Sequence, residues 1–288
     1  MSQIYITVIG AWGDALAALG NATLLERANI EHFGVIYFGF DPHIKTFLEL
    51  QQGVEEVVHI KPQSKEHYEE VCLMACCTEN SNWKDWKPLL RTELDIEGII
   101  IQTHITDFLQ RVSPETCVRD FQCKLATEPV PFAKPTILLQ PFSVQSSTFQ
   151  EHWPYWTQTI DWLLENGGFD YVLVGLPKGI RPCDGEVEFV FPGVPKHPRL
   201  YNLVGKTTSM IDVLELADQS HGIITTSNCL SMWSIIRKKP ALVMEAAKKS
   251  RYFSNWIRSE PNTLLEQNTP FEDFKDVCKN WLSGLDCK

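Results

Sequence analysis

An aspartate follows the first apolar segment of the chain, at a position where a carboxylate can act as a base. Residues 4–9 (IYITVI) are rich in β-branched side chains and predict a strand, and the turn at residues 10–14 (GAWGD) leads into a stretch rich in Ala and Leu that predicts a helix. A carboxylate on such a turn lies beyond the carboxyl end of the strand, where it can accept a proton from a hydroxyl group. Capping of the helix by Asp14 is the competing interpretation.

A lysine lies beside a second predicted helix start, in residues 205–209 (GKTTS). Thr208 or Ser209 is expected to cap a helix that runs to about residue 217. Lys206, next to the helix N-terminus, can bind a phosphate group. The segment is not a P-loop, because the upstream glycine of that motif is missing. A capped helix start without a ligand remains the alternative.

A run of small polar side chains separates a predicted strand at residues 222–225 from a helix that starts close to Leu230. The run is residues 225–229 (TTSNC). Hydroxyl and amide groups, together with the backbone N–H groups of a helix N-terminus, can surround an anion. Capping alone would require only one of these residues, so both a ligand site and a simple cap stay open.

Strand-like and helix-like segments alternate along the whole chain, which predicts βαβ units and parallel sheets. Residues 127–135 (TEPVPFAKP) contain three prolines and predict a linker. We therefore expect an α/β fold of two Rossmann-like domains that face a cleft, at residues 1–130 and 131–269. A last helix is predicted at residues 271–285, and packing of the C-terminal segment 270–288 against the first domain is an open alternative. Ligands are expected at the carboxyl ends of both sets of strands.

The charge of the chain disfavours a nucleic-acid partner. The net charge is −10, and residues 1–135 carry 11 Lys and Arg against 19 Asp and Glu. Binding to a polyphosphate depends on cationic side chains, which this half lacks.

Hydrophobicity and cysteine usage predict a cytoplasmic protein. No apolar run approaches the length of about 20 residues that spans a bilayer, and the first residues show neither the basic region nor the cleavage-like site expected of a secretory signal. The nine cysteines are scattered, and their spacing fits neither a zinc site nor a set of disulfides. We therefore expect reduced cysteines and no bound metal.

The order and spacing of these segments resemble the lipopolysaccharide heptosyltransferase family of glycosyltransferases, which has the GT-B fold. The resemblance covers most of the chain. It rests on the following segments: Gly13-Asp14 with residues 15–19 (ALAAL), Trp153-Pro154, the strand that ends in Gly175, residues 203–207 (LVGKT), the strand, turn and helix at residues 223–239, and Pro240 with the strand after it.

The resemblance implies an inverting, metal-independent transfer of a sugar from a nucleotide-sugar to an acceptor hydroxyl. Asp14 would be the catalytic base. The residues that would bind the donor are Gly13, Gly175, Lys206, Thr207, Thr226, Ser227, Asn228 and Cys229. Lys248, Lys249 and Arg251 are further candidates for binding phosphate, with an exposed basic loop as the alternative. No cofactor is expected besides the nucleotide-sugar as co-substrate, and the acceptor would be a glycan, a lipid-linked glycan or a protein.

Several family positions carry other residues here. The family's nucleotide turn reads Asp-Thr-Gly with a His three residues later, and the matching residues are Ser227, Asn228, Cys229 and Met232. Glu151 replaces a Lys that often precedes the Trp-Pro pair. These changes leave the donor open and motivate two alternatives. One is a catalytically silent GT-B scaffold that binds a partner. The other is a glycosyltransferase that modifies nucleic acid, which the acidic first half disfavours.

Overall fold

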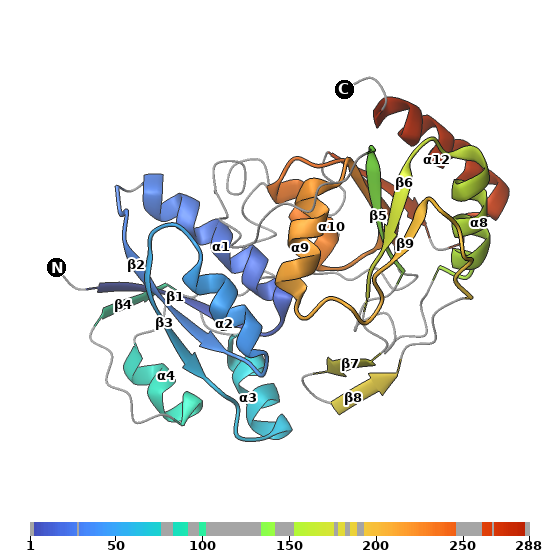
Figure 1. Cartoon of the computed structure of the whole chain (residues 1–288). Coiled ribbons are helices and arrows are strands. Elements are labelled where there is room, and N and C mark those ends of the chain that lie inside the picture. The colour runs from blue at the N-terminus through green and yellow to red at the C-terminus, as the bar shows by residue number, and fades with distance from the viewer. Residues whose placement is uncertain are drawn as a thin grey trace. The chain divides into compact units, whose positions relative to one another are not determined.

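The computed structural model of the chain contains two compact units, Met1–Ala126 and Thr127–Lys288 (Figure 1). The division lies close to the boundary at residue 130 that the sequence predicts. The structure describes residues 3–27, 29–75, 83–91, 98–101, 134–141, 153–175, 178–181, 185–188, 193–245, 261–266 and 268–285. Each unit contains its own parallel sheet with helices packed on it, so the predicted α/β class is confirmed.

A four-stranded sheet, with all paired strands parallel, organises the first unit. Its order is β3-β2-β1-β4, and the strands are β1 (Gln3–Ile9), β2 (Phe33–Phe38), β3 (Val54–Ile60) and β4 (Gly98–Ile101). All six residues of β2 are buried, as is typical of a parallel strand covered on both faces. Since the strands are parallel, their carboxyl ends meet at one edge of the sheet.

Four helices of the described residues accompany this sheet. They are α1 (Trp12–Arg27), α2 (Pro42–Glu49), α3 (Lys65–Ala75) and α4 (Trp83–Leu90). Helix α1 contacts β1, α2 contacts β3, and α4 contacts β4. Helices α1 and α2 both begin beyond the carboxyl ends of strands, and they contact each other. The side chains at these two helix starts are therefore brought to the same edge of the sheet.

A six-stranded parallel sheet organises the second unit, in the order β12-β11-β10-β5-β6-β9. The strands are β5 (Thr136–Gln140), β6 (Asp170–Leu173), β9 (Leu200–Asn202), β10 (Gly222–Thr226), β11 (Ala241–Glu245) and β12 (Asn262–Glu266). Strands β10, β5 and β6 are neighbours, although they are far apart in the sequence. The carboxyl ends of these three strands therefore lie next to one another.

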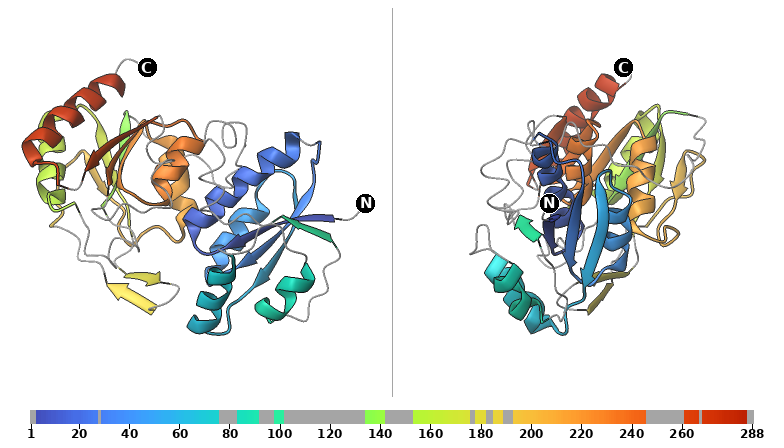
Figure 2. Two further views of the ribbon diagram at one scale, coloured as in Figure 1. Left: turned by 180° about the vertical axis from the view of Figure 1, so that it is seen from behind. Right: turned by 90° about the vertical axis from the view of Figure 1, so that its left-hand side faces the viewer.

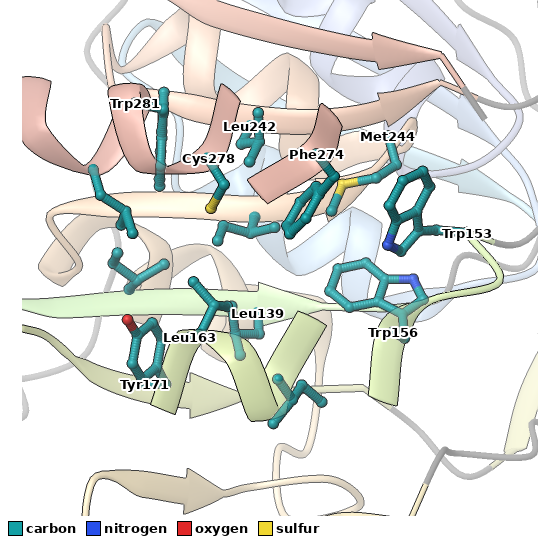
Figure 3. Packing of buried hydrophobic residues seen from close by; sticks show 14 of the residues in the cluster. Leu139, Trp153, Trp156, Leu163, Tyr171, Leu242, Met244, Phe274, Cys278 and Trp281 are labelled. Atoms are coloured by element: carbon teal, nitrogen blue, oxygen red, sulfur yellow. The ribbon is translucent and has the colours of Figure 1, made fainter. Parts of the chain in front are cut away.

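Among its described residues, the second unit contains the helices α8 (Trp156–Asn166), α9 (Met210–Gln219), α10 (Cys229–Ile236) and α12 (Phe271–Leu285). Helices α8 and α12 lie side by side on this sheet (Figures 1 and 2). The C-terminal helix α12 contributes Phe274, Cys278 and Trp281 to the buried core of this unit, where they join Trp153 and Leu242 (Figure 3). The helix thus packs on the second unit.

The structure adds elements that the sequence pattern did not predict. Helix α4 lies in a Trp-rich segment that the sequence left unassigned, and β9 and β12 form the two edges of the large sheet. The short strand β8 (Gly185–Glu188) pairs antiparallel with β7 (Lys178–Arg181) in a separate two-stranded sheet. Within the described part of the chain, no helix has the length and apolar character needed to span a bilayer.

Phe274 should be the side chain through which α12 contributes most to the stability of the second unit. It is fully buried and its ring lies 5.4 Å from that of Trp153. Phe274→Ala is expected to cost about 3–5 kcal/mol, because it leaves a cavity in a packed core. Calorimetric melting would measure the loss, with Lys279→Ala on the exposed side of the same helix as the matched control. Equal melting temperatures for the two variants would contradict this packing.

Candidate functional site

Asp14 lies in the first turn of α1, directly beyond the carboxyl end of β1. Its Oδ2 accepts a hydrogen bond from the backbone N–H of Ala11 at 2.7 Å. A carboxylate at the third helical position closes a helix start in this way in a capping box. The capping role considered from the sequence is therefore present. The carboxylate can still accept further hydrogen bonds or a proton, because an ionised carboxylate has about four lone-pair sites.

Gly10 makes this position of the Asp14 carboxylate possible. A Cβ atom on residue 10 would lie 2.2 Å from Asp14 Oδ2, which is far inside van der Waals contact. The φ angle of Gly10 is also positive, at 128°, a conformation that side chains disfavour. The turn at residues 10–14 thus requires glycine at its first position in order to bring the acid back over the strand end.

Burial tunes the acidity of Asp14. It raises the pKa of the carboxyl from its ordinary value of 3.8 to about 6, against the opposing effect of hydrogen bonds from the backbone N–H groups of Ala11 and Asp14. A general base works best when its pKa lies near the operating pH, because it is then both ionised and basic. Asp14 therefore has the location and the acidity of a base for a hydroxyl proton.

Two side chains that sequence analysis did not single out meet beside Asp14. The indole Nε1–H of Trp12 donates to Oδ2 of Asp41 at 2.8 Å. Asp41 is also the N-cap of α2, and its Oδ1 accepts from the backbone N–H of His43 at 2.9 Å. One carboxylate therefore fixes the start of α2 and holds the side chain that opens α1.

Tyr37 and His59 extend this group along the sheet edge. The hydroxyl of Tyr37 accepts from the backbone N–H of Asp41 at 3.2 Å, and its ring stacks on that of His59 at 4.8 Å. His59 Nε2 in turn lies 3.0 Å from the carbonyl oxygen of Gly39. Burial raises the pKa of Tyr37, and the negative charges of Asp41 and Asp14 raise it further. The Tyr37 hydroxyl therefore stays neutral at physiological pH, close to two acids.

We refer to Trp12, Asp14, Tyr37, Asp41 and His59 as the first-unit cluster. The signal that could have revealed it is the position of these residues in the sequence. Asp41 comes three residues after the end of β2, as a polar residue directly before Pro42, and His59 is the penultimate residue of β3. Only the parallel pairing of β1, β2 and β3 places these strand ends together.

In the second unit, Asn228 organises the turn between β10 and α10. It is the N-cap of α10, and its Oδ1 accepts from the backbone N–H of Leu230 at 2.8 Å. Its Nδ2 donates to Gln140 Oε1 and to Thr225 Oγ1, both at 2.8 Å. The predicted cap is present, and the amide also ties the end of β10 to the end of β5 through Gln140, a residue that the sequence gave no reason to select.

The neighbours of Asn228 in the predicted donor turn have different environments. Thr226 is buried at the end of β10, and the backbone N–H of Ser227 donates to the carbonyl oxygen of Met244 at 3.0 Å. Burial raises the pKa of the Cys229 thiol to about 12, so this side chain is neutral at physiological pH. The turn is therefore a fixed, uncharged structure at the N-terminus of a helix, where the helix dipole favours an anion.

The predicted residues Gly175, Lys206 and Thr207 lie next to the turn that follows β6. Gly175 has a φ angle of 146°, and its carbonyl oxygen accepts from the backbone N–H of Gly205 at 2.9 Å. Lys206 is exposed, and Thr207 is partly exposed. The structure thus joins Gly175 to the lysine-bearing turn. Strands β6 and β10 lie on either side of β5 in the same parallel sheet. The turn that contains Gly175 and the turn between β10 and α10 therefore lie at the same carboxyl edge of that sheet.

The helix start after Lys206 is capped as the sequence predicts. Ser209 is the N-cap of α9, and Asp212 Oδ2 accepts from the backbone N–H of Ser209 at 3.0 Å and of Thr208 at 2.6 Å. Gly13, the remaining predicted residue, lies in the first turn of α1 beside Asp14.

Some predicted positions fall outside the described residues, namely Glu151, Lys248, Lys249 and Arg251. Within the described ranges, no group of three or more His, Cys, Asp or Glu side chains could hold a metal ion.

Asp14 should make the stability of the protein fall as the pH rises from about 4 to 6. Because folding raises the pKa of Asp14 to about 6, the folded chain holds this proton more tightly than the unfolded chain, and stability is lost as the proton leaves. Asp14→Asn keeps the acceptor for Ala11 but cannot ionise. The melting temperature of Asp14→Asn minus that of the natural protein should therefore be larger at pH 7 than at pH 4.

Asp161→Asn, which removes one exposed carboxylate from α8, controls for the general loss of a negative charge. If the difference in melting temperature between Asp14→Asn and the natural protein is the same at pH 4 and pH 7, the raised pKa of Asp14 is wrong.

No protein-family model matches the sequence, and no curated protein matches it. Solved structures do match the fold. A glycosyl transferase family 9 protein from Veillonella parvula has a TM-score of 0.60 at 11% identity, over 97% of this chain and 89% of that one. The E. coli ADP-heptose lipopolysaccharide heptosyltransferase II has a TM-score of 0.60 at 13% identity, over 99% of both chains.

The E. coli heptosyltransferase WaaC, solved with ADP, also has a TM-score of 0.60, at 11% identity, over 96% of this chain and 99% of that one. At these identities the similarity concerns the fold. The resemblance to the GT-B fold of the heptosyltransferases, expected from the order of the sequence segments, is thereby confirmed over nearly the whole chain.

Proposed function

We propose that the protein is an inverting glycosyltransferase that moves a sugar from a nucleotide-sugar to a hydroxyl group of an acceptor, without a metal ion. The observation that carries the proposal is Asp14, a carboxylate at the carboxyl end of β1 whose pKa is raised to about 6, in a chain with the fold of the heptosyltransferases. The acceptor is proposed to be a glycan, a lipid-linked glycan or a protein in the cytoplasm.

In the proposed mechanism Asp14 takes the proton of the acceptor hydroxyl while the hydroxyl oxygen attacks the anomeric carbon of the donor sugar. The nucleoside diphosphate leaves from the opposite side, so one displacement inverts the configuration at that carbon. Gly10 supports this step indirectly, because it lets the carboxylate turn back over the strand end. Positioned general bases typically contribute about 10²–10⁴-fold to a rate.

The second unit is proposed to bind the donor. The diphosphate would lie against the start of α10, at the turn formed by Thr226, Ser227, Asn228 and Cys229. Lys206 would supply positive charge, with Thr207 and Gly175 beside it. Gly13, next to Asp14, would contact the sugar of the donor. Fixed dipoles and one cation stabilise a leaving diphosphate without any reorganisation during the reaction, and this is typically a large part of catalysis.

A binding protein that has lost catalysis is the second candidate, and the environment of the turn favours it. Asn228 uses both its Oδ1 and its Nδ2 within the protein, and the Ser227 N–H is bonded to Met244. Such a turn is stable without a ligand. The Asp and His of the family's nucleotide turn are also replaced here, by Ser227 and Met232.

A thermal-shift screen of nucleoside diphosphates and their sugars should identify the donor base. Ligand at 100 times its dissociation constant stabilises a protein by about 2.7 kcal/mol. Asn228→Asp should weaken the binding of the best nucleotide about tenfold or more, since a second negative charge about 8 Å from a phosphate costs about 2 kcal/mol at an effective dielectric constant of 20. An aspartate still caps α10, so the helix start is retained.

Asn280→Asp adds the same charge at an exposed position of α12 and is the matched control. Unchanged nucleotide affinity in Asn228→Asp would remove the turn from the donor site. The absence of any stabilising nucleotide would favour the second candidate.

Asp14→Asn should abolish sugar transfer while leaving the nucleotide-induced thermal shift intact. The variant keeps a hydrogen-bond acceptor for Ala11, so helix α1 should still form, but an amide cannot take a proton from a hydroxyl. We expect the release of nucleoside diphosphate in the presence of acceptor to fall by about 10²–10⁴-fold. In the natural protein this rate should rise with pH through about 6, as Asp14 ionises. A variant that keeps most of its rate would show that the base is another residue.

A further inference from the structure

Trp12 presents a half-exposed aromatic ring at the carboxyl edge of the first sheet, two residues before Asp14. Large aromatic side chains are usually buried, and a partly exposed indole beside a reactive group is a common means of binding a ring-shaped ligand. The mechanism described above assigns no role to Trp12. We therefore consider what holds this ring and which ligand its surroundings would accept.

The ring is held in a fixed orientation. Its Nε1–H donates to Asp41 at 2.8 Å, and its centroid lies 5.3 Å from that of Phe47 on α2, at an interplanar angle of 59°. Asp41 is itself fixed, because it caps α2 through the backbone N–H of His43 and donates its own N–H to Tyr37. A side chain that is ordered before the ligand arrives loses little entropy on binding, which increases affinity.

The charges around Trp12 select among ring-shaped ligands. Asp14 and Asp41 are both acids, and Asp41 lies against the indole through its Oδ2. Both charges act on the nearby Tyr37 hydroxyl, whose pKa is raised first by burial and further by the two acids. A nucleotide or another phosphate-bearing ring would be repelled by this pair. A neutral sugar ring would not be repelled. The weakly positive C–H groups on one face of a pyranose can lie against the negative face of an indole, while its hydroxyl groups are hydrogen-bond donors to carboxylates.

We propose that Trp12 is the platform on which the acceptor binds, through the apolar face of a neutral pyranose ring, with Asp41 as the positioning residue that holds the indole. The inference rests on the proposed function, because it gives the acceptor hydroxyl a place beside Asp14. It specifies the acceptor further: the sugar next to the reacting hydroxyl is a pyranose without a phosphate group of its own.

The test uses the intact protein labelled with 5-fluorotryptophan and observed by ¹⁹F NMR. The chain contains nine tryptophans, and the Trp12 signal is identified by its loss in Trp12→Phe. The probes are the methyl pyranosides of glucose, galactose, mannose and N-acetylglucosamine. Sorbitol, an open-chain polyol without a ring face, is the control ligand. We expect the Trp12 signal to shift in a saturable manner with at least one pyranoside and not with sorbitol.

Three variants separate the roles of the side chains, with affinities measured by saturation-transfer NMR on the probe itself. Trp12→Leu should weaken pyranoside binding about tenfold, which corresponds to about 1.4 kcal/mol. Trp12→Phe retains a ring but loses the bond to Asp41, so its effect should be smaller than that of Trp12→Leu. Asp41→Asn has one amide oxygen in place of the two carboxylate oxygens that accept from Trp12 and His43, so the indole is held less firmly, and pyranoside binding should weaken by less than in Trp12→Leu.

The proposal is overturned if no pyranoside shifts the Trp12 signal, if sorbitol shifts it equally, or if Trp12→Leu binds the probes with unchanged affinity. These outcomes differ from a failure of the proposed function, which the nucleotide thermal-shift screen measures separately. Nucleotide binding without a shift at Trp12 would refute the platform alone. A saturable shift at Trp12 in a protein that binds no nucleotide would keep the platform and refute the transferase.

Discussion

The hydrogen bond between the Ala11 N–H and the Asp14 carboxylate is the interaction on which the first unit's chemistry depends. It closes the first turn of α1 and holds the acid at the end of β1, where desolvation raises the pKa of the carboxyl to about 6 although the hydrogen bond itself lowers it. Glycine at residue 10 is the condition for this arrangement, because a side chain there would overlap with the carboxylate. The turn at residues 10–14 thus determines both where α1 starts and the environment that sets the pKa of Asp14.

The second unit uses an amide in the corresponding place. Asn228 caps α10 with its oxygen, as an acid would, while its nitrogen bonds to Gln140 and Thr225. The link to Gln140 joins residues 88 positions apart in the sequence and fixes the ends of β5 and β10 relative to each other. The turn is therefore rigid and carries no charge of its own, so that the attraction for a diphosphate would come from the helix dipole and from Lys206. The heptosyltransferase pattern has an acid, a histidine and a lysine where this chain has Ser227, Met232 and Glu151, so the charges offered to a donor differ from those of that pattern.

Much of this could be predicted from the sequence, where local patterns determine the outcome. The central strands are apolar and β-branched, the helix at residues 271–285 has the bounds predicted for it, and Asp14, Ser209 and Asn228 occupy the helix starts that their residue types favour. The edge strands β9 and β12 were missed because both are only partly buried, and β9 is also only three residues long.

The contacts of Trp12, Asp41 and Gln140 were missed for a different reason. They arise from the pairing of strands that are distant in the sequence, such as the register that places Ile9 beside Phe38. No local sequence pattern contains this information, so the contacts of these three residues can be identified only in the folded chain.

The central claim is that Asp14 is a half-buried carboxylate with a raised pKa, poised to act as a base near neutral pH. The most direct measurement is a pH titration of aspartate side chains labelled with ¹³C at the carboxyl carbon, with the Asp14 resonance assigned by its absence in Asp14→Asn. A titration midpoint at about 6 is the predicted result. A midpoint close to the ordinary aspartate value of 3.8 would contradict the claim, because such a carboxylate would be too weak a base for the proposed transfer.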